Sequence, residues 1–191
     1  MTAERLNSVK EYYFSSKLRE VSLLIKSGKP IINLGIGSPD LLPSGSIIKS
    51  LLESLDEPTA HQYQSYQGIP ELRKAISSFY NTHYNVKLNS DEQILPLIGS
   101  KEGIMHISMA FLNPGDKVLI PNPGYPTYSS VTKLLDAEPI PYELDESKGW
   151  LPDLEKLDKS DMSKVKLMWL NYPHMPTGSE ANDKFYKKII L

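Results

Sequence analysis

Three loops rich in glycine and proline carry the residues of this chain that are best suited to chemistry. They run from Gly99 to Gly103, from Pro121 to Pro126 and from Asn171 to Gly178. Each loop follows an apolar run that is typical of a buried strand, and ligands of open α/β sheets gather beyond the carboxyl ends of the strands. We therefore predict that the three loops lie at one edge of a sheet and form a binding site.

The first loop, GSKEG, is expected to lead from a strand directly into a helix. Backbone N–H groups would then point outward at the positive end of the helix dipole, which is a phosphate-binding geometry. Gly99 would allow the close approach of an anion. The alternative is an ordinary helix start in which Ser100 is the capping residue.

The other two loops present an aromatic ring and an apolar side chain. Tyr125 lies between Pro123 and Pro126, where a fixed ring could stack on a flat aromatic ligand or pack over the sheet edge. Met175 lies at the centre of a polar turn, WLNYPHMPTG, although its side chain has no strong hydrogen-bond donor. The sequence pattern alone does not explain this methionine.

Other chemical motifs are weak in this sequence. The G-x-G in LGIGSPD lacks the third glycine of a dinucleotide-binding fingerprint and is not followed by a helix start. The four histidines show no HxxxH pairing, and the chain contains no cysteine, so we expect no metal site and no disulfide. No nucleophile elbow and no Walker loop occurs.

Composition indicates an ordinary globular protein. The 191 residues are 40% hydrophobic and 23% charged, with a formal net charge of −2. This charge provides no positive field for nucleic acid or acidic membranes, and no apolar run is long enough to span a bilayer. The charged N-terminus lacks an apolar signal core, so we expect a cytoplasmic protein that binds neither nucleic acid nor membrane.

The hydrophobic pattern predicts alternating strands and helices in the second half of the chain. This alternation indicates the α/β class, with a mainly parallel sheet flanked by helices. Predicted strands cover residues 92–99, 117–121, 138–144 and 165–170, and prolines suggest that residues 138–144 form an edge strand. Predicted helices cover residues 15–27, 46–55, 100–112, 125–135, 151–157 and 180–190, with a further one that begins near Pro70.

The last predicted helix, KFYKKIIL, continues to the final residue without a stop signal. A crossover helix needs a following strand, and a four-stranded sheet of this size would leave apolar faces uncovered. We therefore expect that the chain is an N-terminal part of a longer protein.

Five segments in order give the chain a family resemblance. They are INLGIGSPD, YQSYQGIPELRKAI, IGSKEGI, FLNPGDKVLIPNPGYPTY and NYPHMPTG. Together they resemble the N-terminal half of class I/II aminotransferases, which are pyridoxal-phosphate enzymes of fold type I. The subgroup is similar to aspartate and LL-diaminopimelate aminotransferase-like proteins. The resemblance implies an N-terminal arm and small-domain segment at residues 1–45, and a partial large cofactor-binding domain at residues 46–191.

The resemblance also implies roles for individual residues. Ser100 and Lys101 match the turn that holds the phosphate of pyridoxal 5'-phosphate, and Tyr125 matches the ring that stacks on the cofactor's pyridine. Tyr63 matches the tyrosine that reaches across a homodimer interface to the partner's phosphate. Gly37 matches the glycine near the substrate carboxylate. In the third loop, Asn171 is expected to brace the turn, and the family pattern implies cis peptide bonds at Asn122–Pro123 and Met175–Pro176.

Two departures from the family pattern limit these expectations. The family's Schiff-base lysine lies further along than this sequence extends, so we expect no catalytic lysine here and no transamination by this chain alone. Met175 stands where the family has an asparagine that donates a hydrogen bond to the cofactor's phenolic oxygen. Loss of this hydrogen bond costs about 1.5–3 kcal/mol, which corresponds to a change of about one to two units in the pKa of the cofactor's Schiff base. Alternatively, another donor replaces the amide and Met175 only packs.

The expected function is the transfer of an amino group between an L-amino acid and a 2-oxo acid, in a homodimer. A lyase of the same fold is the alternative within the family. A non-catalytic aminotransferase-like sensor or binding domain is the alternative outside it.

Overall fold

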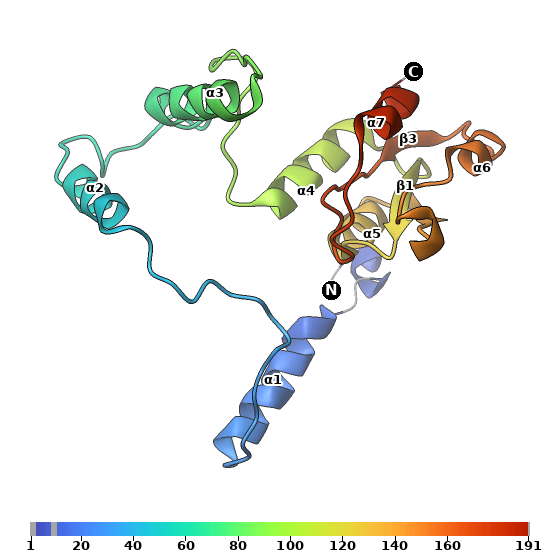
Figure 1. The fold of residues 1–191 in the computed structure, drawn as a ribbon, viewed down its shortest axis with the longest axis horizontal. Coiled ribbons are helices and arrows are strands. Elements are labelled where there is room, and N and C mark those ends of the chain that lie inside the picture. Colours follow the sequence, from blue (N-terminus) through green and yellow to red (C-terminus); the bar gives the residue numbers. More distant parts are fainter. Residues whose placement is uncertain (1–2, 9–10, 191) are drawn as a thin grey trace. The chain divides into compact units, whose positions relative to one another are not determined.

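A computed structural model describes residues 3–8 and 11–190 of the chain (Figure 1). Residues 98–190 form one compact unit together with the N-terminal turn, and residues 11–97 form another. The first contains η1 (Glu4–Ser8), α4 (Ser100–Phe111), β1 (Lys117–Asn122), α5 (Pro126–Leu134), β2 (Glu138–Glu143), η2 (Glu146–Lys148), α6 (Leu154–Asp158), β3 (Val165–Met168) and α7 (Asp183–Ile190). The second contains α1 (Tyr13–Lys26), α2 (Gly45–Leu55) and α3 (Pro70–Tyr84). The domain boundary predicted near residue 45 stays a prediction.

A parallel sheet organises the first unit, in the strand order β2-β1-β3. β1 pairs in parallel with both neighbours, in register Leu119 opposite Ile140 on one side and Leu119 opposite Met168 on the other. This confirms the predicted α/β class and the predicted edge position of β2. The central strand β1 is the most buried of the three, because parallel strands are covered on both faces.

Two apolar clusters cover the two faces of this sheet. On one face, Ile104 of α4 and Tyr128 and Val131 of α5 pack together, with Ile120 of β1 against them. On the other face, Leu119, Tyr142 and Leu144 form a cluster, against which Leu157 of α6 and residues of β3 pack. Neighbouring residues Leu119 and Ile120 therefore face opposite sides, as the strand period of two requires.

The strand predicted at residues 92–99 is wrong. Residues 94–97 carry no regular secondary structure, and the side chains of Leu95, Leu97 and Ile98 are exposed. A strand requires a ladder partner, and this segment finds none among the described residues. Pro96 also removes one backbone donor from the middle of the segment. The apolar pattern of this segment indicates an extended chain. Whether an extended chain joins a sheet depends on a partner strand that is distant in the sequence.

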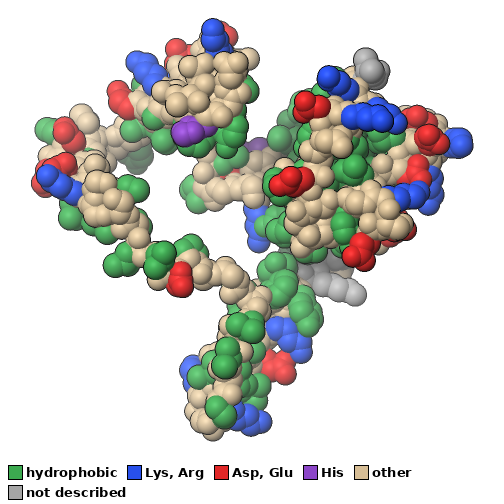
Figure 2. All heavy atoms as spheres, viewed as in Figure 1, with side chains coloured by type: hydrophobic (Ala, Val, Ile, Leu, Met, Phe, Trp, Pro, Cys, Tyr) green, Lys and Arg blue, Asp and Glu red, His purple; other side chains and the backbone are tan. Residues whose placement is uncertain are grey.

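In the second unit, the two N-terminal helices have no buried residue. Their sequences are amphipathic, yet the apolar side chains of α2 are exposed (Figure 2). These side chains are Ile47, Ile48, Leu51, Leu52 and Leu55. α2 begins with a cap in which the Ser44 hydroxyl accepts a hydrogen bond from the Ser46 N–H. α3 is the only described helix of this unit with a buried side chain, which belongs to Arg73.

Candidate functional site

The N-terminus of α4 leaves backbone donors without a side-chain partner. Its N-cap is Gly99, at a φ of 105°, and no side chain caps the helix. The alternative in which Ser100 caps this helix is therefore wrong, because Ser100 is its first helical residue. The first N–H groups of a helix have no intrahelical acceptor, so an uncapped helix start can donate to a bound anion.

Open space surrounds this helix start. A Cβ built on Gly99 would meet no atom within 4 Å. One hydrogen bond fixes the turn: the Glu102 carboxylate accepts from the Ile98 N–H at 2.6 Å. The result is a fixed turn with outward-facing donors, which suits an anion.

Lys101 and Tyr125 come together at this turn. The Lys101 ammonium lies 5.8 Å from the centre of the Tyr125 ring, within the range of a cation–π contact. Tyr125 is the N-cap residue of α5, with Pro126 at the first helical position, so its backbone is fixed where the helix begins. Its ring contacts that of Tyr128 edge-to-face at 5.8 Å. The loop after β1 thus carries a half-buried, oriented ring beside the start of α4.

Gly124 allows the tight backbone turn before Tyr125. A Cβ at this position would lie 2.3 Å from the carbonyl oxygen of Pro121 and 2.7 Å from its Cγ. No side chain fits there, so only glycine permits this path. Just before the turn, the Asn122 amide donates to both carboxylate oxygens of Glu143 at 2.9 Å, which joins the ends of β1 and β2.

Trp169, which lies just before the third loop, is held by two contacts. The Trp169 ring stacks on Tyr128 at 5.0 Å and 11° between planes, and the Trp169 carbonyl accepts a 2.6 Å hydrogen bond from the Tyr142 hydroxyl. Burial raises the pKa of Tyr142, so this phenol stays protonated and keeps donating. These contacts fix the direction in which the chain leaves β3.

Within the loop, Asn171 braces the turn, as expected. Its side-chain oxygen accepts a hydrogen bond from the Met175 N–H at 3.1 Å. The Met175 side chain is 45% exposed, so it is not a core residue. The cis peptide bonds expected at Asn122–Pro123 and Met175–Pro176 are confirmed, and Tyr172–Pro173 is also cis.

His174 is a buried polar residue of this loop that the sequence analysis did not single out. It is 3% exposed, and its Nδ1 lies 2.8 Å from the Thr177 hydroxyl. Its Nε2 has no hydrogen-bond partner within the part of the chain that the structure describes. Burial lowers the pKa of His174, although the nearby Pro123 carbonyl opposes this effect, so the imidazole is neutral at pH 7. The Nε2 atom is a buried polar group that a bound group or another polypeptide segment could satisfy.

The remaining predicted site residues belong to the second unit. The Tyr63 side chain is fully exposed, and Gly37 lies in an exposed segment with no atom within 4 Å of a built Cβ. Ser100, Lys101, Tyr125 and Met175 therefore share one unit, while Tyr63 and Gly37 share the other. Their assigned roles stay predictions.

One cavity lies away from these loops. It has a volume of about 440 Å³ and is lined by residues of η2, α6 and α7, including Leu151, Asp153 and Phe185. None of the predicted site residues lines it. Among residues 3–8 and 11–190, no group of three histidines or carboxylates could hold a metal ion, and no helix is long and apolar enough to cross a membrane.

Comparison with known proteins agrees with this geometry. The model of the family "Aminotransferase class I and II" matches residues 29–191. The chain is 41% identical over 189 residues to an LL-diaminopimelate aminotransferase of Natranaerobius thermophilus, covering 99% of this chain and 49% of the relative. It is 42% identical over 175 residues to the transaminase BacF of Bacillus subtilis, covering 92% of this chain and 44% of BacF.

Solved structures give the same result. The chain superimposes on apo-BacF of Bacillus subtilis with a TM-score of 0.92 and 39% identity, covering 99% of this chain and 48% of that one. An alanine aminotransferase of Pyrococcus furiosus gives a TM-score of 0.88 and 28% identity. This match covers 100% of the present chain and 48% of the alanine aminotransferase. The chain spans about half the length of the relatives that it matches. It belongs to the class I and II aminotransferases, with the fold type I architecture, and corresponds to the N-terminal part of such an enzyme.

Proposed function

We propose that this chain supplies the phosphate-binding and ring-stacking half of the cofactor site in an enzyme that moves an amino group between an L-amino acid and a 2-oxo acid. The family's cofactor is pyridoxal 5'-phosphate. One observation carries the proposal: the uncapped start of α4 lies beside the ring of Tyr125, with Lys101 between them.

The residues present fit this cofactor. Its phosphate is a dianion, and the start of α4 offers the positive end of the helix dipole, the Ser100 hydroxyl and the Lys101 ammonium, with open space over Gly99. Its pyridine is a flat ring, and Tyr125 presents a flat ring held by the start of α5.

The contribution of this chain is binding and orientation. The cofactor, when bound, supplies an electron sink for the carbon that carries the amino group. Ser100, Lys101 and the helix dipole hold its phosphate and so fix its position along the site. Tyr125 restricts the tilt of the ring, because stacked rings attract each other most in a parallel, offset arrangement. Met175 cannot donate a hydrogen bond to an oxygen on the ring.

We further propose that the enzyme is a cytoplasmic homodimer in which Tyr63 reaches the phosphate held by the partner. The exposure of Tyr63 supports this, because a fully exposed tyrosine is available to another subunit. The substrate is an amino acid whose side chain the site residues of this chain do not define.

Absorption spectroscopy of the full-length protein tests the function. We expect added pyridoxal 5'-phosphate to bind and its visible spectrum to change when an amino acid is added. Tyr125→Leu should weaken cofactor binding by about two- to tenfold, on the order of the loss of one aromatic stacking contact. The control is Tyr84→Leu, at a tyrosine that is 63% exposed on α3 and outside the proposed site.

The 191-residue chain alone provides a second test. We expect no amino-acid-dependent change in absorbance beyond that of the free cofactor, because the resemblance places the family's Schiff-base lysine outside these 191 residues. Turnover by this segment would contradict the assigned roles.

A further inference from the structure

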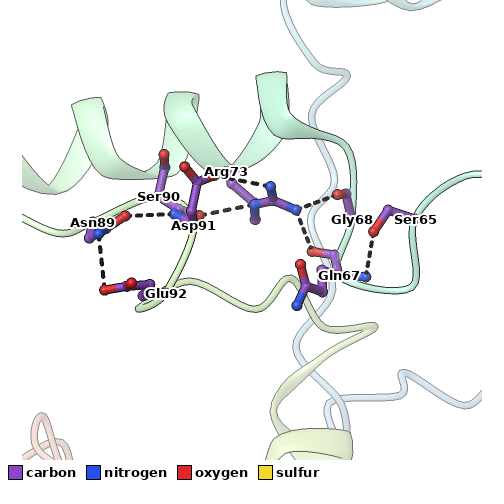
Figure 3. A network of polar contacts seen from close by, with 8 residues as sticks. All are labelled: Ser65, Gln67, Gly68, Arg73, Asn89, Ser90, Asp91 and Glu92. Carbon is purple, nitrogen blue, oxygen red and sulfur yellow. Dashed lines mark hydrogen bonds and ion pairs between the residues drawn. The ribbon is translucent and has the colours of Figure 1, made fainter.

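Arg73 is a buried guanidinium that connects two separate segments of the second unit (Figure 3). It is 7% exposed. On one side its Nη1 donates to the carbonyls of Gly68 at 2.7 Å and Gln67 at 3.4 Å. On the other side its Nε donates to the carbonyl of Ser90 at 2.9 Å, and its Nη2 pairs with Asp91 at 3.2 Å. One side chain thus joins the loop before α3 to the segment after it.

The backbone carbonyls matter more than the ion pair in this arrangement. The Asp91 side chain is 71% exposed, so its charge is largely screened by water. The three carbonyl acceptors are part of the chain path, and the planar guanidinium carries donors in a fixed fork that can reach all of them together. Lysine, with a single ammonium, cannot reproduce this geometry.

A second contact fixes the same loop. Gly68 has a φ of 83°, and a Cβ there would lie 2.8 Å from Cγ of Pro96, so the loop backbone packs directly on the segment after α3. The turn itself closes through two hydrogen bonds. The Gly68 N–H donates to the Ser65 carbonyl at 2.9 Å, and the Gln67 N–H donates to the Ser65 hydroxyl at 3.2 Å.

The anchored loop presents two exposed aromatic side chains. Tyr63 and Tyr66 have relative exposures of 107% and 94%. The Gln64 amide between them donates to the Thr59 carbonyl at 2.8 Å, which ties the other end of the loop. The loop backbone is therefore tied at both ends, which defines where the two tyrosines leave the loop.

We propose that Arg73 is a positioning residue for the cofactor site of a second copy of this chain. By holding the carbonyls of Gln67 and Gly68, it fixes one end of the loop that carries Tyr63 and so helps to place the Tyr63 hydroxyl where it can donate to the phosphate that the partner's α4 start holds. The inference rests on the proposed function. It adds a residue that touches neither cofactor nor substrate and that acts through Tyr63.

A double-mutant cycle on cofactor affinity tests this role in the full-length protein. The readout is the dissociation constant of pyridoxal 5'-phosphate, from a titration of the apoprotein. Tyr63→Phe should lower affinity about tenfold or more, as expected for one hydrogen bond to a charged oxygen. Arg73→Lys should lower it by about the same factor in the wild-type background, and by less than about twofold in the Tyr63→Phe background. A residue that only stabilises the fold would cause equal losses in both backgrounds, and that result would overturn the inference.

Two further variants keep the test decisive if Arg73→Lys does not fold. Ser65→Ala removes an acceptor from the same turn without touching the buried guanidinium, and its smaller loss of affinity should also vanish in the Tyr63→Phe background. The control, Asp91→Asn, keeps the carbonyl acceptors and should bind the cofactor as the wild type does. An equal loss from Ser65→Ala in both backgrounds would also overturn the inference.

The outcomes separate the two proposals. If the wild-type protein binds no cofactor, the proposed function fails and the inference fails with it. If the wild type binds but Tyr63→Phe binds equally well, the inference and the proposed role of Tyr63 fail, while the proposed cofactor site at the α4 start stands.

Discussion

Gly124 offers the sharpest test of how the fold positions Tyr125. The glycine lies between the end of the central strand and the tyrosine, and its built Cβ lies 2.3 Å from the carbonyl oxygen of Pro121. Pro121 belongs to β1, which is paired on both sides in the sheet. The strand cannot easily retreat, so in Gly124→Ala the loop that carries Tyr125 must move.

The size of this movement follows from the contact distance. Carbon and oxygen atoms that are not bonded prefer separations above about 3.3 Å, so the loop must shift by about 1 Å. Overpacking of this kind costs about 1–3 kcal/mol of stability. A displacement of about 1 Å at a binding residue can cost up to about 100-fold in function. We therefore expect Gly124→Ala to weaken cofactor binding by at least about tenfold, in addition to lowering the melting temperature.

The assay compares Gly124→Ala with Gly45→Ala in the full-length protein. A Cβ at Gly45 would meet no atom within 4 Å, and Gly45 is the first residue of α2. The control should therefore keep the wild-type melting temperature and cofactor affinity, or gain slightly from the helix propensity of alanine. Wild-type affinity and melting temperature in Gly124→Ala would refute the reasoning, because they would show that the turn accommodates a side chain without moving Tyr125.

Two other substitutions probe the rim of the site. Met175→Asn should restore a hydrogen-bond donor and lower the pKa of the cofactor's Schiff base in the full-length enzyme by about one to two units, measured by a spectral pH titration; identical titration curves for the two proteins would contradict this. Tyr142→Phe leaves the Trp169 carbonyl without its donor and should cost about 1–3 kcal/mol, measured by urea unfolding at pH 8. Burial raises the pKa of Tyr142, and burial raises the pKa of Tyr172 to about 12, so above pH 10 the unfolded chain loses these protons before the folded chain does. The free energy of unfolding should therefore fall as the pH rises above 10, and Tyr142 should account for up to about 1.4 kcal/mol of this loss at pH 11. Over the same pH range the free energy of unfolding of Tyr142→Phe should fall by less than that of the wild type.

Most helices and strands could be predicted because their signals are local. Periodic apolar residues and the glycine and proline boundaries locate α4, β1 and α5, with Pro126 at the first helical position. The segment around Pro96 shows where local signals end. Its apolar residues specify an extended chain, but only a partner strand could make it part of a sheet.

The candidate site was predictable to a similar degree. The GSK turn, Tyr125 and the proline-rich third loop stand out in the sequence because their residue types have special backbone requirements. The N-cap could not be assigned in the same way, because Gly99 and Ser100 are both acceptable there and the chain path decides between them. His174 has no sequence signal, since an isolated histidine looks the same whether it is buried or exposed.

By itself, the sequence determined the kinds of group available: a helix start beside glycine, an aromatic ring between prolines, and a methionine in place of an amide donor. Only the tertiary structure decided which of these groups meet. It places the Lys101 ammonium 5.8 Å from the Tyr125 ring, closes Gly124 onto Pro121 and buries Arg73 among carbonyls from two segments. These contacts join residues that are distant along the chain or that depend on an exact backbone path. Local propensity carries no information about them, because their energies arise only when the packed elements bring the atoms together.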